Sequence, residues 1–169
     1  MKRFIFVSVV LVLISVNATA QNRTYVDLGL TSGTKWCSKN ESGYWSYSNA
    51  RNSFGSSLPT MEQFSELIAE CEWTWTGSGY RVKGSNGNAI YLPADGFDTD
   101  KKGRCGYSGG KGESGNYWSY SPIEGPNDDR YSWGLFFSRG FYKTDKLCVM
   151  TRDQTCGSVY SLYSVRLVQ

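Results

Sequence analysis

The sequence predicts a mixed fold of short β-strands joined by many turns, with one clear helix. Glycine is abundant, with 19 residues, and aromatic residues make up 15% of the chain. Glycine, serine and asparagine recur every few residues, and this composition is typical of short strands separated by turns. One stretch, residues 60–72, has instead the capping residues and the apolar spacing of a helix.

The first twenty residues have the pattern of a secretory signal peptide. Lys2 and Arg3 precede an apolar run over residues 4–16, and Ala18-Thr19-Ala20 is a small-x-small cleavage site. The run of about 13 residues is shorter than the roughly 20 that a membrane-spanning helix needs. We therefore expect cleavage after Ala20 and an exported protein, located in the periplasm, on the outer surface or in the medium.

The remaining residues, 21–169, are expected to form one domain. These 149 residues are enough to bury roughly two thirds of the surface of the unfolded chain. Removal of Lys2 and Arg3 leaves 16 basic and 15 acidic residues, a net charge of +1. A nearly neutral chain without a basic block gives no electrostatic reason to expect nucleic acid or an anionic membrane surface as a partner. The sequence has no second apolar run, so we expect no integral membrane segment in residues 21–169.

The helix is predicted from Met61 to about Glu72. Thr60 is a favourable N-cap, and Gln63 completes a capping box three residues later. The apolar positions with helical spacing are Phe64, Leu67, Ile68 and Cys71. The acidic positions on the other side are Glu62, Glu66 and Glu70. We expect Phe64, Leu67 and Ile68 to face the core, and the glutamates to form a solvated face rather than a metal or acid–base cluster.

A hairpin is predicted after the helix. Residues 80–83 and 89–92 are its strands, and Asn86-Gly87 is a strong turn signal because both residues tolerate positive φ. Pro93 ends the second strand because it has no backbone N–H to donate. Further short strands are predicted at residues 117–121, 132–137, 146–150 and 161–168. Two long irregular loops are predicted at residues 95–115 and 122–131.

Several blocks of the sequence have the pattern of a known family. They are Tyr25–Trp36, Leu58–Trp75 and Gly79–Gly96, followed by Gly115–Ser119, Leu135–Phe137 and Tyr163–Val168. Together these blocks resemble the Fibrobacter succinogenes major paralogous domain, a family of surface proteins abundant in Bacteroidota. The resemblance implies an α+β domain related to the C-type-lectin-like and formylglycine-generating-enzyme-like folds. The chain departs from the family pattern mainly in loops, for example in residues 38–41.

Within such a fold, three tryptophans are expected as core anchors, since each lies in an apolar strand context. They are Trp36, Trp118 and Trp133. Arg166 alternates with Val165 and Leu167 in the last strand. We expect it to be a partly buried structural arginine, with a binding role as the alternative.

The sequence argues against an enzyme. It contains no histidine, so a Ser–His or Cys–His catalytic pair cannot form. Oxidases of the related fold use a closely spaced cysteine pair near the C-terminus, whereas Cys148 and Cys156 are spaced differently. We therefore expect no catalytic residues. Paired carboxylates for glycoside hydrolysis stay open as an alternative, because the sequence does not give their separation in space.

The cysteines and the acidic loop are candidate structural and metal sites. The five cysteines are Cys37, Cys71, Cys105, Cys148 and Cys156, an odd number with open connectivity. A turn near Arg152 would place Cys148 opposite Cys156, which makes this pair the candidate disulfide. Asn127, Asp128 and Asp129 follow Pro126, as in a lectin calcium loop, but calcium needs about six to eight oxygen ligands and the expected partner motif is absent. We expect no metal and no cofactor, with calcium as the alternative.

Aromatic residues in polar surroundings are the best signal for binding. Tyr44, Trp45 and Tyr47 lie among glycine and serine, and further tyrosines lie near the C-terminal loops. Tyrosine with serine, glycine and asparagine suits adaptable recognition, although these rings could also cover an aromatic core.

We therefore expect an exported, non-catalytic binding module that recognises glycan or protein at the cell surface through its loops. The expected ligand-binding residues are Tyr107, Tyr131, Asn127, Asp128 and Asp129. The alternatives are a glycan-active or oxidase-type enzyme of the same superfamily, or a structural component of a surface assembly.

Overall fold

The structure is a computed structural model that describes residues 22–99, 110–122, 131–139, 147–151 and 161–169. The helical elements are α1 (Tyr47–Phe54), the 3-10 helix η1 (Gly55–Ser57) and α2 (Met61–Glu70). The strands are β1 (Tyr25–Asp27), β2 (Lys35–Cys37), β3 (Glu72–Trp75), β4 (Gly79–Lys83), β5 (Ala89–Pro93), β6 (Asp98–Thr99), β7 (Ser114–Pro122), β8 (Tyr131–Ser138), β9 (Leu147–Thr151) and β10 (Ser161–Leu162). The predicted α+β organisation with short antiparallel strands is confirmed.

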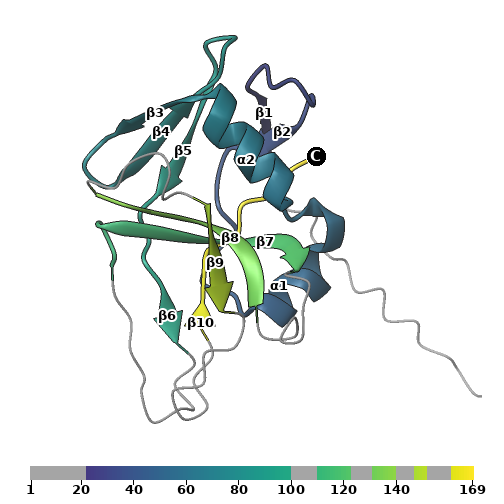
Figure 1. Ribbon diagram of the computed structural model, residues 1–169, viewed down its shortest axis with the longest axis vertical. Helices are drawn as coiled ribbons and strands as arrows, with labels where there is room; N and C mark the ends of the chain where they lie inside the picture. Colours follow the sequence, from purple (N-terminus) through teal and green to yellow (C-terminus); the bar gives the residue numbers. More distant parts are fainter. Residues whose placement is uncertain (1–21, 100–109, 123–130, 140–146, 152–160) are drawn as a thin grey trace, which may run out of the picture.

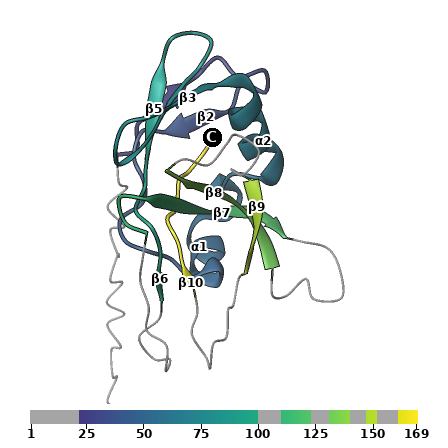
Figure 2. The same cartoon turned by 60° about the vertical axis from the view of Figure 1, so that its left-hand side comes forward.

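The strands form small antiparallel sheets. β3–β4–β5 and β7–β8–β9 are three-stranded, and the pairs β1–β2 and β6–β10 are two-stranded. Figures 1 and 2 show β3–β4–β5 and α2 on one side of the β7–β8–β9 sheet, with α1 and the β6–β10 pair toward its other side. No helix in the described ranges is long and apolar enough to cross a membrane.

The predicted helix and its cap are confirmed in α2. The Gln63 backbone N–H donates to Thr60 Oγ1 at 3.3 Å, and the Thr60 N–H donates to Gln63 Oε1 at 2.8 Å. Phe64 and Leu67 are fully buried, and Ile68 is half-buried against the same core. The helix ends at Glu70, earlier than expected, because the chain turns at once into β3.

Replacing Leu67 with alanine should lower the free energy of unfolding by about 2–5 kcal/mol, because the side chain is fully buried and would leave a cavity. The matched control is Glu62→Ala on the exposed side of α2, where we expect a change within about 0.5 kcal/mol. Urea denaturation of both variants measures the difference. Equal losses in the two would contradict the apolar stripe.

Two of the three glutamates on the solvated face of α2 also make hydrogen bonds to another element. The Ser32 N–H and hydroxyl donate to the Glu66 carboxylate at 2.7 and 2.6 Å, and the Thr31 N–H donates to Glu70 at 2.9 Å. These backbone amides belong to the turn between β1 and β2, where they have no ladder partner. The two carboxylates therefore join α2 to this turn.

The predicted hairpin is confirmed as β4–β5, in which Lys83 pairs with Ala89 and the turn lies at residues 84–88. Gly87 has φ +88°, as the turn requires. Gly84 lies so close to β1 that a Cβ atom there would be 1.8 Å from the Leu28 carbonyl oxygen. Asn86 and Asn88 both donate to the Asp27 carbonyl oxygen, so the turn is also tied to β1.

The last predicted strand is wrong in length. Only Ser161–Leu162 is a strand, and the rest of the C-terminal segment pairs in single bridges with several different neighbours. Cys37 N–H donates to the Leu167 carbonyl, and Tyr163 and Trp45 exchange two backbone hydrogen bonds. The apolar alternation that predicted one strand therefore arises from a buried segment that crosses several elements.

Two apolar clusters form the core of the described part. The first contains Trp36, Phe64 and Leu67 and packs α2 against β3–β4–β5, and the second contains Trp118, Val165 and Leu167 and packs α1 against β7 and the C-terminal segment. Trp36 and Trp118 are fully buried, as expected. Trp133 is only half-buried, so the expectation of a core anchor is wrong for it.

The structure has a second helix, α1, in addition to the clear one that the sequence predicts. Its N-cap is Ser46, whose hydroxyl accepts from the Asn49 N–H at 3.3 Å, and Gly55 ends it with φ +51°. The sequence of α1 is rich in serine, asparagine and arginine, and the first two favour caps and turns over helix interiors. Burial of Tyr47 and Ala50 against the second cluster stabilises the helix instead.

Candidate binding pocket

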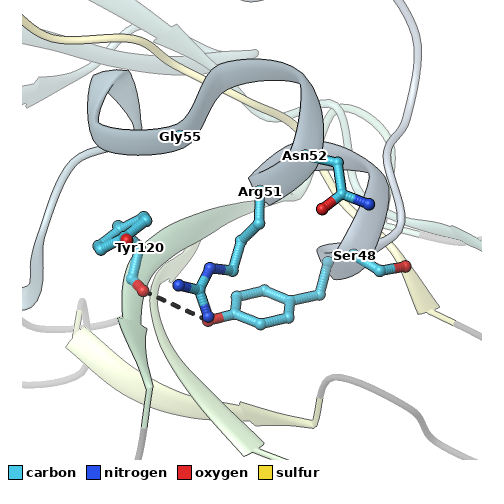
Figure 3. Close-up of a pocket in the computed structure, with 6 residues that line it drawn as sticks. Ser48, Arg51, Asn52, Gly55 and Tyr120 are labelled. Carbon is cyan, nitrogen blue, oxygen red and sulfur yellow. Dashed lines mark hydrogen bonds between the residues drawn. The ribbon is translucent and has the colours of Figure 1, made fainter.

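An open cavity of about 360 Å³ lies between α1 and β7. It is lined by Tyr47, Ser48, Arg51, Asn52, Gly55 and Tyr120. Figure 3 shows the Arg51 side chain leaving the helix toward Tyr120, with Ser48 and Asn52 on the same helix. The pocket is therefore built by one face of α1 and one residue of a neighbouring strand.

The helical side of the pocket follows from the spacing along α1. Tyr47, Arg51 and Gly55 are four residues apart, as are Ser48 and Asn52, so both rows lie on one face of the helix. Gly55 accommodates the positive φ that ends the helix, and its N–H donates to the Arg51 carbonyl. No atom lies within 4 Å of a Cβ built on Gly55, so this end of the pocket is open.

The strand side of the pocket is a local irregularity in β7. The β7–β8 register shifts between Trp118 and Pro122, and Tyr120 lies within that interval. The Tyr120 N–H donates to the Pro59 carbonyl at 2.8 Å instead of to the sheet. Bulges of this kind re-aim a side chain relative to a regular strand, and here the Tyr120 ring lies against α1.

Arg51 lies against both tyrosine rings. Its Cζ atom is 4.5 Å from the Tyr120 ring centroid and 5.7 Å from that of Tyr47, within cation–π range. The Tyr47 hydroxyl donates to the Tyr120 carbonyl at 3.3 Å and joins the two walls (Figure 3). Hydrogen bonding to the Tyr120 side chain raises the pKa of Arg51, while burial acts in the opposite direction. The guanidinium therefore stays charged.

The positive charge of Arg51 has no carboxylate partner in the described ranges. The ion pairs found there join Arg23 to Glu41 at 2.7 Å and Lys83 to Glu72 at 3.9 Å. The half-buried guanidinium of Arg51 thus contrasts with that of Arg23, whose charge is already compensated. This difference makes the α1–β7 pocket the candidate site rather than a smaller cavity of about 120 Å³ beside Arg23 and Glu41.

A rigid support lies behind the pocket. The Trp118 ring packs edge-on against Tyr47, with centroids 5.3 Å apart, and its Nε1 donates to the Trp45 carbonyl at 2.7 Å. Trp118 is fully buried, as is Ala50 on the inner face of α1. The pocket walls are therefore fixed to the core.

Arg166 is fully buried and makes a different set of contacts. Its guanidinium donates to Asn40 Oδ1, the Cys37 carbonyl and the Tyr91 carbonyl, each at 2.7 Å. Burial lowers its pKa, with Tyr117 the main opposing influence. Burial also raises the pKa of Tyr117, so its hydroxyl stays protonated and donates to the Pro93 carbonyl. Arg166 is more buried than expected and joins β2, β5 and the C-terminal segment.

The Cys71 thiol is not activated. Cys37 and Cys71 are both free and buried. Burial, with smaller contributions from Glu70 and Glu66, raises the pKa of Cys71 to about 11. Such a thiol is almost wholly protonated at neutral pH and is a poor nucleophile. Across the described ranges, no three acidic or cysteine side chains gather as a metal site would require.

Most of the residues expected to bind ligand lie outside the described residues. These are Tyr107, Asn127, Asp128 and Asp129. Tyr131 begins β8, where its backbone pairs with Thr151. Cys148 lies in β9 opposite Gly134, but Cys156 is outside the described residues, and so is the candidate disulfide.

The aromatic residues near α1 were only partly interpreted from the sequence. Tyr44 donates to the Asp95 carbonyl, and Trp45 packs edge-on against Phe54, so these two mainly cover the core. Tyr47 alone of the three lines the pocket. The sequence did not predict a binding role for the other side chains of the pocket, which are Ser48, Arg51, Asn52 and Tyr120. The four-residue spacing from Tyr47 to Arg51 indicates a shared face only if residues 47–54 are known to form a helix.

Comparisons of the chain with protein-family models, with curated proteins and with solved structures found no match.

Proposed function

We propose that the chain is an exported, non-catalytic binding module with a C-type-lectin-like fold that recognises glycan at the cell surface. The observation that carries the proposal is the α1–β7 pocket, which combines two tyrosine rings with a charged guanidinium. The fold assignment is supported by the sequence resemblance described above, and export by the pattern of residues 1–20.

The chemistry of the pocket supports binding over catalysis. The described residues that line it include no carboxylate and no thiol, and the whole chain has no histidine. Arg51 stays protonated at neutral pH, so it offers no general base there. The same groups are well suited to hold a ligand by stacking and hydrogen bonding.

The composition of the pocket supports a glycan. A sugar ring has apolar C–H faces and hydroxyl groups around its edge, and it fits a site with aromatic rings and a few polar groups. The two tyrosine rings can stack against the C–H faces of a sugar. Ser48, Asn52 and Arg51 can form hydrogen bonds with its hydroxyl groups. The volume of about 360 Å³ suits one or two sugar units more than a large folded partner.

Replacing Tyr120 with alanine should weaken glycan binding at least about tenfold, because the ring forms one wall of the pocket and lies against Arg51. The matched control is Tyr91→Ala, which removes an exposed tyrosine of β5 that lies outside the pocket lining. A glycan array of neutral and acidic sugars, probed with the wild type and both variants, measures the effect. Equal binding by all three proteins would contradict the proposed pocket.

A further inference from the structure

We propose that the preferred ligand of the α1–β7 pocket is a sugar that carries a carboxylate, of the uronic-acid type, bound through Arg51. This inference rests on the proposed glycan-binding function and names its substrate class.

The first argument is the geometry of Arg51. The N–H donors of a guanidinium lie in its plane, and a carboxylate matches two of them in a bidentate contact. In this pocket the guanidinium lies over the Tyr120 ring at 4.5 Å, so an aromatic ring covers one of its faces. An oxyanion can still approach along its edge. The cation–π contact with Tyr120 leaves the in-plane N–H donors of Arg51 to bind a ligand.

The second argument is charge. Among the described residues that line the pocket, Arg51 is the only basic one and none is acidic. In the described ranges the half-buried guanidinium of Arg51 has no counter-ion, so a ligand with one negative charge can compensate its charge. A carboxylate carries one charge, whereas a phosphate monoester carries close to two at neutral pH and would leave part of its charge unpaired here.

The third argument favours a sugar over an acidic peptide. Ser48 and Asn52 are exposed polar residues on the same face of α1 as Arg51, and they can reach the hydroxyl groups beside a ring carboxylate. An aspartate or glutamate side chain has no such hydroxyl groups, so it would use Arg51 alone. The open end at Gly55 leaves room for the next unit of a glycan chain.

The test compares four soluble probes by NMR titration of the ¹⁵N-labelled full chain. They are glucuronic acid, its methyl ester, glucose 6-sulfate and N-acetylglutamate. We expect glucuronic acid to bind about ten- to a hundredfold more tightly than its methyl ester, which has the same ring without the charge. N-acetylglutamate and glucose 6-sulfate should bind more weakly than glucuronic acid.

Variants of Arg51 assign the effect to this residue. Arg51→Gln should remove the preference for the acid over the ester, and Arg51→Lys should retain part of it because the charge remains. Arg81→Gln is the control, since Arg81 is an exposed arginine of β4 outside the pocket; it should bind like the wild type. Thermal melts of all variants verify that each is folded.

The outcomes separate this inference from the proposed function. Equal affinity for the acid and the ester, in a site still sensitive to Tyr120→Ala, would overturn the carboxylate inference and leave a neutral-glycan site. Stronger binding of N-acetylglutamate or glucose 6-sulfate would also overturn it. A preference for the acid that survives Arg51→Gln would place the carboxylate elsewhere. If no glycan or acidic sugar binds at any concentration, both proposals are wrong.

Discussion

Replacing Arg166 with methionine should lower the free energy of unfolding by about 3–5 kcal/mol. The methionine keeps most of the apolar stem but has no N–H donors. Three acceptors then lose their partner: the buried Cys37 carbonyl, and the part-buried Asn40 side-chain oxygen and Tyr91 carbonyl. Each such orphaned group costs about 1–3 kcal/mol, partly offset because the arginine no longer has to be desolvated.

The control for Arg166 is Arg81→Met, an exposed arginine in β4. Its change in stability should stay within about 0.5 kcal/mol. Chemical denaturation measures both. Similar losses of unfolding free energy in the two variants would mean that the hydrogen bonds of Arg166 do not stabilise the fold more than an exposed arginine does.

Replacing Trp118 with alanine should cost about 3–5 kcal/mol, because a fully buried indole is removed from the second core cluster. The Nε1 hydrogen bond to the Trp45 carbonyl is lost as well. Because Trp118 packs against Tyr47 and lies behind the pocket, glycan affinity should fall together with stability.

The comparison for Trp118 is Trp133→Ala, since Trp133 is half-buried and lies outside the pocket lining. We expect a smaller loss of stability and no loss of affinity. Denaturation curves and binding titrations at a temperature where both variants are folded measure the two effects. A larger destabilisation from Trp133→Ala would contradict the assignment of the core.

The elements that the sequence predicts well have strong local signals. The α2 helix has a capping box at Thr60 and Gln63 and an apolar stripe, and local chemistry alone determines where it begins. The β4–β5 hairpin has Asn86-Gly87 at its turn. In both cases the local preference and the tertiary packing agree, so pattern and structure coincide.

The elements that the sequence does not predict depend on tertiary contacts. The α1 helix has weak intrinsic preference and is stabilised by burial of Tyr47 and Ala50. The C-terminal segment has the alternation of a strand, but its backbone partners belong to several elements. The packing partners of α1 and the backbone partners of the C-terminal segment are distant in sequence, so no local pattern predicts them.

The pocket could not be found from the sequence for the same reason. It requires the missed helix and also the register shift that includes Tyr120, and no local residue pattern marks that shift. From the sequence we expect recognition in the loops at residues 95–115 and 122–131, because these loops are long, polar and rich in glycine. The residues next to Arg51 in the sequence do not indicate a binding role. The fold brings its guanidinium against the rings of Tyr47 and Tyr120.

The most direct test of the α1–β7 pocket as the recognition site is a crystal structure of the full chain, from crystals grown or soaked with glucuronic acid. We predict that the sugar occupies the α1–β7 pocket, with its carboxylate within about 3 Å of the Arg51 guanidinium nitrogens and its ring against Tyr47 or Tyr120. A sugar bound instead in the loops at residues 95–115 or 122–131, with the α1–β7 pocket empty in the same crystal, would contradict the assignment of this pocket as the recognition site.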